Sequence, residues 1–565
     1  MAFFNRYIKL LQDKDPRMTR VNLSGEGINY RQAKVLSKVL KVDTIMMSLD
    51  LSYDDIRELS AVALADALKE NTTLKSLNLR GNEIGSKGID ALADVLKANT
   101  TLVELDLGSN KICANDLVTL FDALKTNTTL QVLRLDYNYI GNEGVAVLSD
   151  VLKTNTSLME LDLKYINTSA EGVVCLSNAL KENTSLIRLN LEENYFGDSG
   201  AEALVDALKI NTKLMELKLK HCGLSVEGVA ALSGALQVNT TLESLDLSEN
   251  GIGSDIAIVL ADLLKTNKSL KRLYLSNNVI GHDGARALSD ALQVNTTLRK
   301  LNLSGNGICA DGARALSDAL QVNTALEELD LSVENIGDDG ARALSGALQV
   351  NTTLKKLDLL GDNIGDDGAR VLSDALRVNT ALEKLDLIGN NIGDDGAIVL
   401  IGMLKMNVVL LSLNLQFNNI SAEAFEQIDG YLRENKKIKK YLHTLFEKAY
   451  LLERGIKVDS DGVEEQADDT DASAPESYIL KLPTELQVCI LSYVVGMEIF
   501  EEHKVNVPEK VTDKVANHLV DKSQRLFEVR TKALEEKKTR ELSDPDDLSV
   551  ELNESENSGS MLCSL

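Results

Sequence analysis

A 28-residue period constrains this chain more than any other feature of its sequence. Leucine recurs every 28 residues from Leu74 to Leu410. The same spacing continues backwards to Met46 and Met18, each followed by a recognisable copy, which makes fifteen units without an insertion or deletion. A fixed period of this length predicts a solenoid, in which each unit buries its apolar face only against its neighbours.

Each unit combines two kinds of local pattern. Leu77 and Leu79 alternate with polar residues, which predicts a short half-buried strand, whereas Ala285, Leu288 and Leu292 share one stripe of a helix. Strands stack about 4.8 Å apart while packed helices need about 8–10 Å, so the array must bend with its strands inside. The sequence therefore predicts an α/β horseshoe with a concave parallel sheet and a convex rim of helices.

An asparagine recurs after the helical half of each unit, from Asn71 to Asn435, and many copies read as Asn-Thr-Thr glycosylation acceptors. Asn211 and Asn323 keep the asparagine but lack the acceptor hydroxyl. We therefore interpret these residues as helix C-caps, since Asn tolerates the left-handed conformation that ends helices. The chain shows no secretory signal and no apolar run of membrane-spanning length, so we expect an unglycosylated cytoplasmic protein.

The chemistry-bearing residues argue against an enzyme. The six cysteines have no metal-ligand spacing and no clustered histidines beside them, so we expect free thiols, no metal and no cofactor. A Gly-rich phosphate loop and a Ser-His-Asp candidate are both missing from the sequence. The formal net charge of −26 disfavours nucleic acid and anionic membrane as main ligands. We expect a monomer that binds a target protein.

The unit LxxLxLxxNxIGxxGAxALxxALxxNTT, nearly unbroken from Leu270 to Leu410, resembles the leucine-rich repeat of the ribonuclease-inhibitor type. Intracellular immune receptors and the GTPase-activating protein of Ran carry similar repeats. The resemblance implies a curved leucine-rich repeat solenoid whose Asn bonds backbone groups in the turn after each strand. That Asn maps onto Asn82, Asn110, Asn138, Asn194, Asn250, Asn278, Asn306, Asn390 and Asn418. Other residues replace it at Glu26, Asp54, Ile166, Cys222, Glu334 and Asp362, and we expect a remodelled turn at Ile166.

Changes of composition give the expected domain boundaries. We assign an N-terminal cap to residues 1–17, the fifteen repeats to 18–437 and a C-terminal capping helix to 438–457. An acidic linker at 458–476, a small helical region at 477–541 and a disordered acidic tail at 542–565 follow.

A solenoid of this kind usually binds through its concave strand face and the loops beside it. The middle outward position of the strands is mostly Asp or Asn, with the exceptions Arg134, Lys218 and Tyr274. Just after the strands, Tyr137 and Tyr165 lie in adjacent units and are expected to stack, with Tyr139 and Tyr195 on the same edge. Aromatic and Arg side chains are typical of binding hot spots, although drift between repeats gives the same pattern.

The segment YILKLPTELQVCILSYVVGM, which begins at Tyr478, resembles the start of an F-box. Its pattern, roughly LPxELxxxILSYL, implies a helix that docks on a Skp-type ubiquitin-ligase adaptor. The docking residues it implies are Leu482, Pro483, Leu486, Ile490, Leu491 and Val494. An ordinary pair of capping helices explains the same residues.

Three functions are therefore open. The first is an interaction protein whose repeats bind a target and whose F-box-like segment recruits the adaptor. The second is a plain binding scaffold or a fragment resembling an immune receptor. The third is a GTPase-activating protein of the Ran type.

Overall fold

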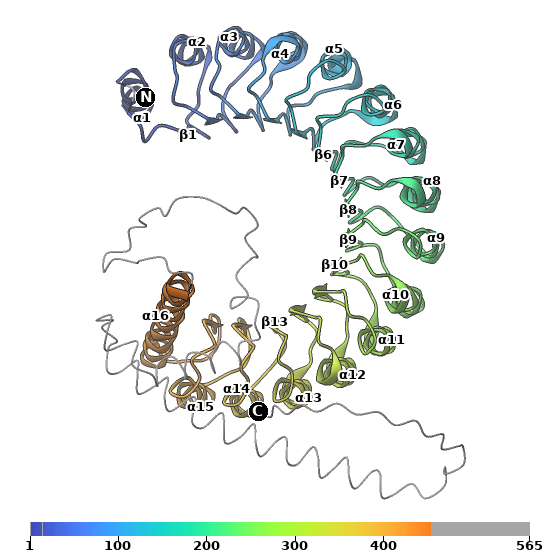
Figure 1. Ribbon diagram of the computed structural model, residues 1–565, viewed down its shortest axis with the longest axis vertical. Coiled ribbons are helices and arrows are strands. Elements are labelled where there is room, and N and C mark those ends of the chain that lie inside the picture. Colours follow the sequence, from blue (N-terminus) through green and yellow to red (C-terminus); the bar gives the residue numbers. More distant parts are fainter. Residues whose placement is uncertain (1, 14, 454–565) are drawn as a thin grey trace, which may run out of the picture. The chain divides into compact units, whose positions relative to one another are not determined.

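The computed structural model describes residues 2–13 and 15–453, which form a curved α/β solenoid (Figure 1). One compact unit, Met1–Lys439, holds all the strands of the described residues, and the second, Lys440–Leu565, is described only as far as Glu453. The predicted linker, F-box-like region and acidic tail lie outside the described residues.

Fifteen strands of three residues each form one parallel sheet in sequence order. Adjacent strands pair in a register of one repeat, as Val21 does with Leu49 and Leu49 with Leu77. The middle residue of each strand is buried, and its two neighbours face the inside of the arc. The strands are β1 (Arg20–Asn22), β2 (Ser48–Asp50), β3 (Ser76–Asn78), β4 (Glu104–Asp106), β5 (Val132–Arg134), β6 (Glu160–Asp162), β7 (Arg188–Asn190), β8 (Glu216–Lys218), β9 (Ser244–Asp246), β10 (Arg272–Tyr274), β11 (Lys300–Asn302), β12 (Glu328–Asp330), β13 (Lys356–Asp358), β14 (Lys384–Asp386) and β15 (Ser412–Asn414).

A helix returns the chain from each strand to the next along the outer rim of the solenoid (Figure 1). These helices and the strands share one continuous core of leucine, alanine and isoleucine, which confirms the predicted bend with the strands inside. The helices are α1 (Ala2–Gln12), α2 (Tyr30–Leu40), α3 (Glu58–Leu68), α4 (Gly85–Ala98), α5 (Ala114–Leu124), α6 (Gly141–Leu152), α7 (Ala170–Glu182), α8 (Gly197–Ile210), α9 (Val226–Leu236), α10 (Ser254–Thr266), α11 (Gly281–Leu292), α12 (Cys309–Val322), α13 (Gly337–Leu348), α14 (Asp366–Leu376), α15 (Asp394–Leu404) and α16 (Ala422–Glu453).

Helices lie at both ends of the repeats. On α1, Phe4, Ile8 and Leu11 are buried at helical spacing, as expected for a helix that covers the first repeat. The C-terminal helix α16 begins at Ala422, well before the expected boundary at residue 438. The helix of the last repeat and the predicted capping helix are thus one continuous helix, since the sequence between them contains no proline to end it.

The recurring Asn after each helix does not adopt the left-handed conformation that we predicted. Asn99, for example, has φ −78° and ψ 130°, which is extended backbone. Its side chain makes the turn instead: the amide nitrogen donates to the carbonyl of Leu68 in the preceding repeat at 2.9 Å, and Oδ1 accepts the backbone amides of Thr101 and Leu102 at 2.9 and 2.8 Å. The nitrogen that would carry a glycan is therefore buried and occupied in the folded chain. Asn435 differs again, because it lies inside α16.

The predicted asparagine ladder in the turns after the strands is present. Asn82 donates to the carbonyls of Leu51 and Leu79, both at 2.9 Å, and accepts from the backbone amide of Ile56 at 3.0 Å. Ile166 has no side-chain group for the ladder bonds, but its carbonyl accepts the amide of Gly141 at 2.9 Å, as the carbonyl of Asn306 accepts that of Gly281 at 3.0 Å. The donation to a leucine carbonyl 31 residues earlier recurs at Asn110, Asn138, Asn194, Asn250, Asn278, Asn306, Asn390 and Asn418.

Candidate interaction surface

The preference for Asp or Asn on the concave face has a structural cause. At the last position of most strands, the side-chain Oδ1 accepts the backbone amide two residues further on, at 2.9–3.4 Å, and so starts the turn. A residue with this bond is therefore not evidence of a binding site. The bond is made by Asn22, Asp50, Asn78, Asp106, Asp162, Asn190, Asp246, Asn302, Asp330, Asp358, Asp386 and Asn414.

The three exceptions, Arg134, Lys218 and Tyr274, lack this short acceptor and present large side chains to the concave face instead. Arg134 bonds Glu104 and also Glu160, the latter at 3.1 Å. The Lys218 ammonium lies 3.6 Å from a neighbouring carboxylate, and a lysine ammonium lies 5.5 Å from the ring centre of Tyr274. All three are thus held in place by neighbours on the sheet, and they remain far enough out to touch a partner.

Aromatic residues occupy strained positions in the loops after the strands. The third residue after each strand has a positive φ, which glycine adopts freely and bulky residues rarely do. In this chain Tyr53, Tyr137, Tyr165 and Phe417 adopt it, with φ between 50° and 58°. Bulky side chains kept in a conformation that disfavours them are the kind of feature that clusters at functional sites.

Tyr137 and Tyr165 form the centre of the surface. Their ring centroids lie 5.3 Å apart with an interplanar angle of 32°. The guanidinium of Arg80 lies 5.8 Å from the ring centre of Tyr137, and the ammonium of Lys164 lies 5.6 Å from it. Both tyrosines stay about 40% exposed, at 39% and 44%. Two stacked rings with cations beside them form a rigid apolar platform with polar edges.

Arg80 reaches this platform from two repeats away. Its Nη1 and Nη2 donate to Oδ1 and Oδ2 of Asp136 at 3.0 and 2.6 Å, and its Nε donates to the hydroxyl of Tyr53 at 3.2 Å. The Arg80 side chain crosses the repeat between Arg80 and Asp136 because that repeat has a glycine, Gly108, with no side chain in the way. A Cβ at Gly108 would lie 2.6 Å from Arg80 Nη1 and 2.7 Å from Asp136 Oδ1. The hydrogen bonds to Asp136 are also the main reason why the pKa of Arg80 is raised.

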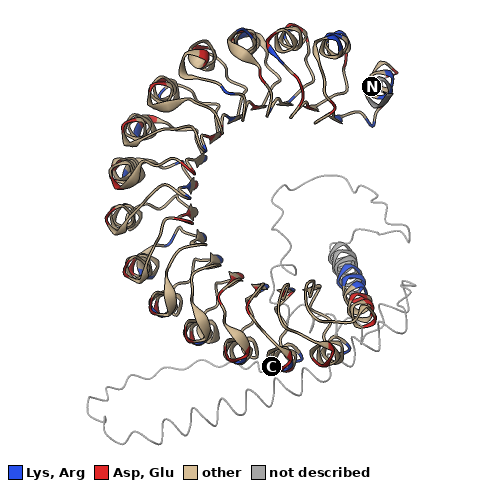
Figure 2. Ribbon diagram, turned by 180° about the vertical axis from the view of Figure 1, so that it is seen from behind, with Lys and Arg blue, Asp and Glu red and all other residues tan. Residues whose placement is uncertain are grey.

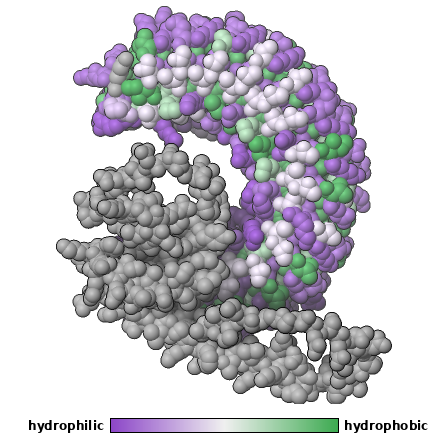
Figure 3. Space-filling view, in the orientation of Figure 1, coloured by the Kyte–Doolittle hydropathy of each residue, from purple (hydrophilic) through white to green (hydrophobic). Residues whose placement is uncertain are grey.

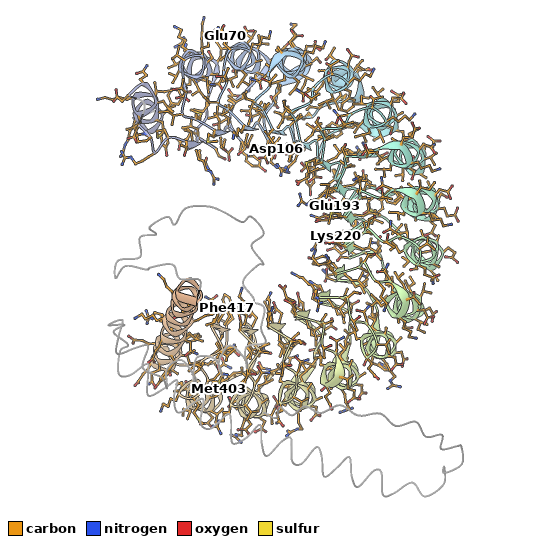
Figure 4. All side chains as sticks on the ribbon, viewed as in Figure 1. Glu70, Asp106, Glu193, Lys220, Met403 and Phe417 are labelled. Carbon is orange, nitrogen blue, oxygen red and sulfur yellow. The ribbon has the colours of Figure 1, made fainter. Side chains whose placement is uncertain are left out.

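Ion pairs continue the surface along the inner edge of the arc. Lys164 contacts Glu193 and Glu192 at 2.9 and 3.2 Å, and Lys220 contacts Glu249 at 2.8 Å. Burial disfavours the charged form of Lys164, but its hydrogen bonds to the two glutamates outweigh burial and raise its pKa. Figure 4 shows Glu193 and Lys220 on this inner edge.

The structure separates the remaining predicted residues from the stacked pair. Tyr195 contacts His221, its hydroxyl against Nε2, with the two rings 4.9 Å apart and nearly perpendicular. Tyr139 and Tyr195 are more exposed than Tyr137 and Tyr165, at 59% and 66%. They border the stack rather than joining it. We call the set Tyr53, Arg80, Asp136, Tyr137, Lys164, Tyr165 and Glu193 the tyrosine cluster.

Our sequence prediction missed Tyr53, Arg80, Asp136, Lys164 and Glu193. A signal for three of them exists in the aligned repeats, because the second position after the strand is a charged residue at Arg80, Asp136 and Lys164 but serine in many other repeats. The contact of Arg80 with Asp136 spans 56 residues and two repeats, which no comparison of adjacent units suggests.

Comparisons with known proteins place the repeats in a family. A sequence model described as Leucine Rich repeat matches residues 126–149, 182–205, 211–233, 238–261, 266–289, 294–317, 322–345, 350–373 and 378–400. The chain is a leucine-rich repeat protein. A second model, the TMOD/LMOD Leucine-rich domain, matches residues 4–110 of this leucine-rich repeat protein. No curated protein matches it significantly in sequence.

Two of the solved structures that match the chain are the following. A chain in the crystal structure of the Rad7 and Elc1 complex in yeast is 17% identical over 70% of this chain and 90% of that chain, with a TM-score of 0.43. The leiomodin-1 actin-binding site 2 is 24% identical over 32% of this chain and 88% of that chain, with a TM-score of 0.23.

Two further findings limit the chemistry of the described residues. Within residues 2–13 and 15–453, no group of three or more His, Cys, Asp or Glu side chains could hold a metal ion. In the same part of the chain, no helix has the length and apolarity needed to cross a membrane. The predicted adaptor-binding residues Leu482, Pro483, Leu486, Ile490, Leu491 and Val494 lie outside the described residues.

Proposed function

We propose that this leucine-rich repeat protein is an intracellular interaction protein whose tyrosine cluster binds a target protein. The observation that carries the proposal is the packing of the Tyr137 ring against the Tyr165 ring, with Arg80 and Lys164 both beside Tyr137, on a surface that stays exposed. Aromatic residues and arginines in fixed positions lose little conformational entropy on binding, and they dominate the energies of known interfaces.

The arrangement supports binding rather than catalysis. The charged groups of the tyrosine cluster are committed to one another, as in the pairs Arg80–Asp136 and Lys164–Glu193. A general acid or base would need a free path to a substrate atom. Fixed ion pairs instead give an interface its orientation and specificity.

Charge supports a protein partner over nucleic acid or anionic membrane. Lys and Arg are interspersed with Asp and Glu along the repeats (Figure 2). A nucleic-acid site needs a basic strip that neutralises several phosphates. A net charge of −26 further opposes such ligands.

Proximity labelling in cells tests target binding. The wild-type chain and the double variant Tyr137→Ala, Tyr165→Ala are each fused to the same labelling enzyme. We expect a target labelled by the wild type and lost with the variant. Phe417→Ala is the matched control, because Phe417 is exposed at the same repeat position far from the tyrosine cluster. Equal labelling by all three chains would contradict the proposal.

We further propose that the F-box-like segment recruits a Skp-type adaptor. The support is the sequence pattern around Leu482, Leu486, Ile490 and Leu491. Burying three such aliphatic side chains contributes about 1.5–3 kcal/mol each before the costs of association. The double variant Leu486→Asp, Ile490→Asp in the full chain should lose the adaptor while its circular dichroism is unchanged. A wild-type chain that fails to bind purified adaptor at tens of micromolar, roughly −6 kcal/mol, would leave a plain binding scaffold.

A hydrolysis assay distinguishes a GTPase-activating function of the Ran type from the binding function proposed above. We expect the purified chain to leave the GTP hydrolysis rate of Ran-like GTPases unchanged. A large acceleration would replace the scaffold proposal, because it would show a chemical role for the repeats.

A further inference from the structure

Two adjacent repeats replace the ladder asparagine by a buried acid. Glu334 and Asp362 hold the position that Asn306 and Asn390 hold on either side of them. In those flanking repeats the asparagine makes two kinds of bond. Oδ1 of Asn390 accepts the backbone amide of Ile364 at 2.9 Å, and its Nδ2 donates to a leucine carbonyl at 2.8 Å.

The acids reproduce the accepting half of this pattern. Glu334 accepts the backbone amides of Asn306 and Ile308, each at 2.6 Å. Oδ1 of Asp362 accepts the backbone amide of Glu334 at 2.7 Å. The two side chains are therefore built into consecutive turns of the sheet, with exposures of 1% for Glu334 and 0% for Asp362.

The donating half is lost when the acids are ionised. Asn306 donates to carbonyls 31 and 3 residues before it, Leu275 and Leu303. By that spacing, the carbonyl of Leu331 is the equivalent carbonyl for both Glu334 and Asp362, and neither carboxylate can donate a hydrogen bond to it. Oδ2 of Asp362, which stands where an asparagine has its amide nitrogen, is buried without a partner. A carboxylic acid can donate from that oxygen, whereas a carboxylate would face carbonyl oxygens.

The backbone of the same turn is strained. Val333 has φ 62°, a left-handed conformation that a β-branched residue rarely adopts. The next two repeats have glycine at this place, Gly361 and Gly389. The turn after β12 thus combines an unfavourable backbone with the missing donor.

The surroundings add negative charge near the two acids. Burial, and to a smaller extent the charge of Asp362, raises the pKa of Glu334 to about 7. Burial together with the charge of Asp358 raises the pKa of Asp362 to about 7. Lys356 is paired with Asp358 at 3.4 Å. The other charged side chains on the strands and helix starts beside these turns are Lys300, Asp311, Glu328, Asp330, Asp338, Asp339, Asp366, Asp367, Lys384 and Asp386.

We infer that the β12–β13 junction is a pH-sensitive weak point of the solenoid, closed while Glu334 and Asp362 keep their protons and opening locally as they ionise. In the opened turn both groups return to an ordinary carboxyl pKa of about 4. Stability from the closed turn is therefore complete below pH 4 and is lost as the pH rises towards 7. This inference does not depend on the target that the tyrosine cluster binds.

Hydrogen exchange on the full chain tests the inference. Protection factors, corrected for the intrinsic exchange rate, are measured for peptides that cover residues 328–336 and 356–364. Between pH 5 and pH 7 we expect protection of these peptides to fall by tenfold or more. Peptides from the β10 repeat, which keeps Asn278, serve as the internal reference and should change by less than twofold.

Variants decide whether the two acids cause the fall. Glu334→Gln with Asp362→Asn restores the amide donors and should abolish the pH dependence. Asp367→Asn removes one charge from the same repeat at an exposed site and should behave as the wild type. The converse change, Asn390→Asp, should create a similar fall at the next junction. A constant protection in the wild type, or an unaltered fall in the restored double variant, would overturn the inference.

Discussion

The loops after strands β2–β8 and the loops after strands β11–β14 stand on the same scaffold but carry different side chains. In the first region Arg80, Asp136, Tyr137, Lys164 and Tyr165 contact one another across repeats. In the second region the corresponding places are mostly serine, glycine or a single aliphatic residue. The comparison shows that the leucine framework folds in the same way with either kind of loop. The framework therefore does not explain the large, mutually contacting loop residues of the first region, and a function in binding does.

The surface of the outer rim supports the same distinction. Figure 3 shows hydrophilic residues over most of the rim, with hydrophobic residues in separate patches. Most of the exposed aromatic residues lie elsewhere: Tyr53, Tyr137, Tyr139, Tyr165 and Tyr195 are in loops after β2, β5, β6 and β7, while Tyr30 is on α2 and Phe417 follows β15. Monomeric proteins seldom gather exposed rings in this way without a partner.

The largest expected effect lies in the scaffold that both regions share. Asn127→Ala in the first region and Asn351→Ala in the second each remove a buried amide whose nitrogen donates to a helix-end carbonyl, at 2.8 and 2.7 Å. Each change also leaves two backbone amides without their acceptor. We expect each to destabilise the solenoid by about 3 kcal/mol, and by equal amounts. Urea unfolding monitored by circular dichroism measures this, and clearly unequal losses would refute a uniform scaffold.

The next effect concerns binding alone. Tyr137→Ala with Tyr165→Ala should weaken binding of the identified target by about 2 kcal/mol or more, on the scale usual for hot spots. Stability should barely change, because both rings are exposed and outside the core. Calorimetric titration gives the affinity, with Phe417→Ala as control. If Phe417→Ala weakens target binding as much as the double tyrosine variant does, the tyrosine cluster is not the binding site.

A smaller effect tests the bond that spans two repeats. Gly108→Ser introduces the residue that many other repeats have, yet its Cβ would displace Arg80 from Asp136. Asp136 is only 3% exposed and would lose its partner, so we expect about 1 kcal/mol of destabilisation and weaker target binding. Ser304→Gly, the reverse exchange in the second region, is the control and should leave target binding unchanged. Differential scanning calorimetry and the same titration provide both readouts.

The smallest effect is expected on the convex rim of the second region. Arg314→Ala removes an ion pair with Asp311 of 2.7 Å whose side chains are 59% and 67% exposed. Solvent screens such pairs, so the free energy of unfolding should change by no more than about 0.5 kcal/mol. A loss above 1 kcal/mol in thermal unfolding would show that the outer ion pairs contribute to the stability of the repeats.

Much of the fold could be predicted from the sequence because the period is strict. Each unit must bury the same leucines, and the two spacings of strands and helices leave one direction of bending. The conformation of Asn99 and its equivalents was predicted wrongly, because local propensity favours a left-handed cap while the actual turn is set by a bond to the preceding repeat.

The candidate surface could be predicted only in part. Tyr137 and Tyr165 stood out because they are aromatic in adjacent units. Arg80 did not, because its contact depends on the space left by Gly108 in the intervening repeat. The role of a glycine such as Gly108 can be read from the sequence only when the two residues that meet above it, Arg80 and Asp136, are already known.

The most direct test of the account is hydroxyl-radical footprinting of the full chain, alone and saturated with its target. Oxidation rates at Tyr137 and Tyr165 are compared with the rate at Phe417, which is 83% exposed at the same repeat position. We predict that binding protects both tyrosines strongly and leaves Phe417 unchanged. Unchanged oxidation of both tyrosines in the saturated complex would contradict the claim that the tyrosine cluster is the binding site.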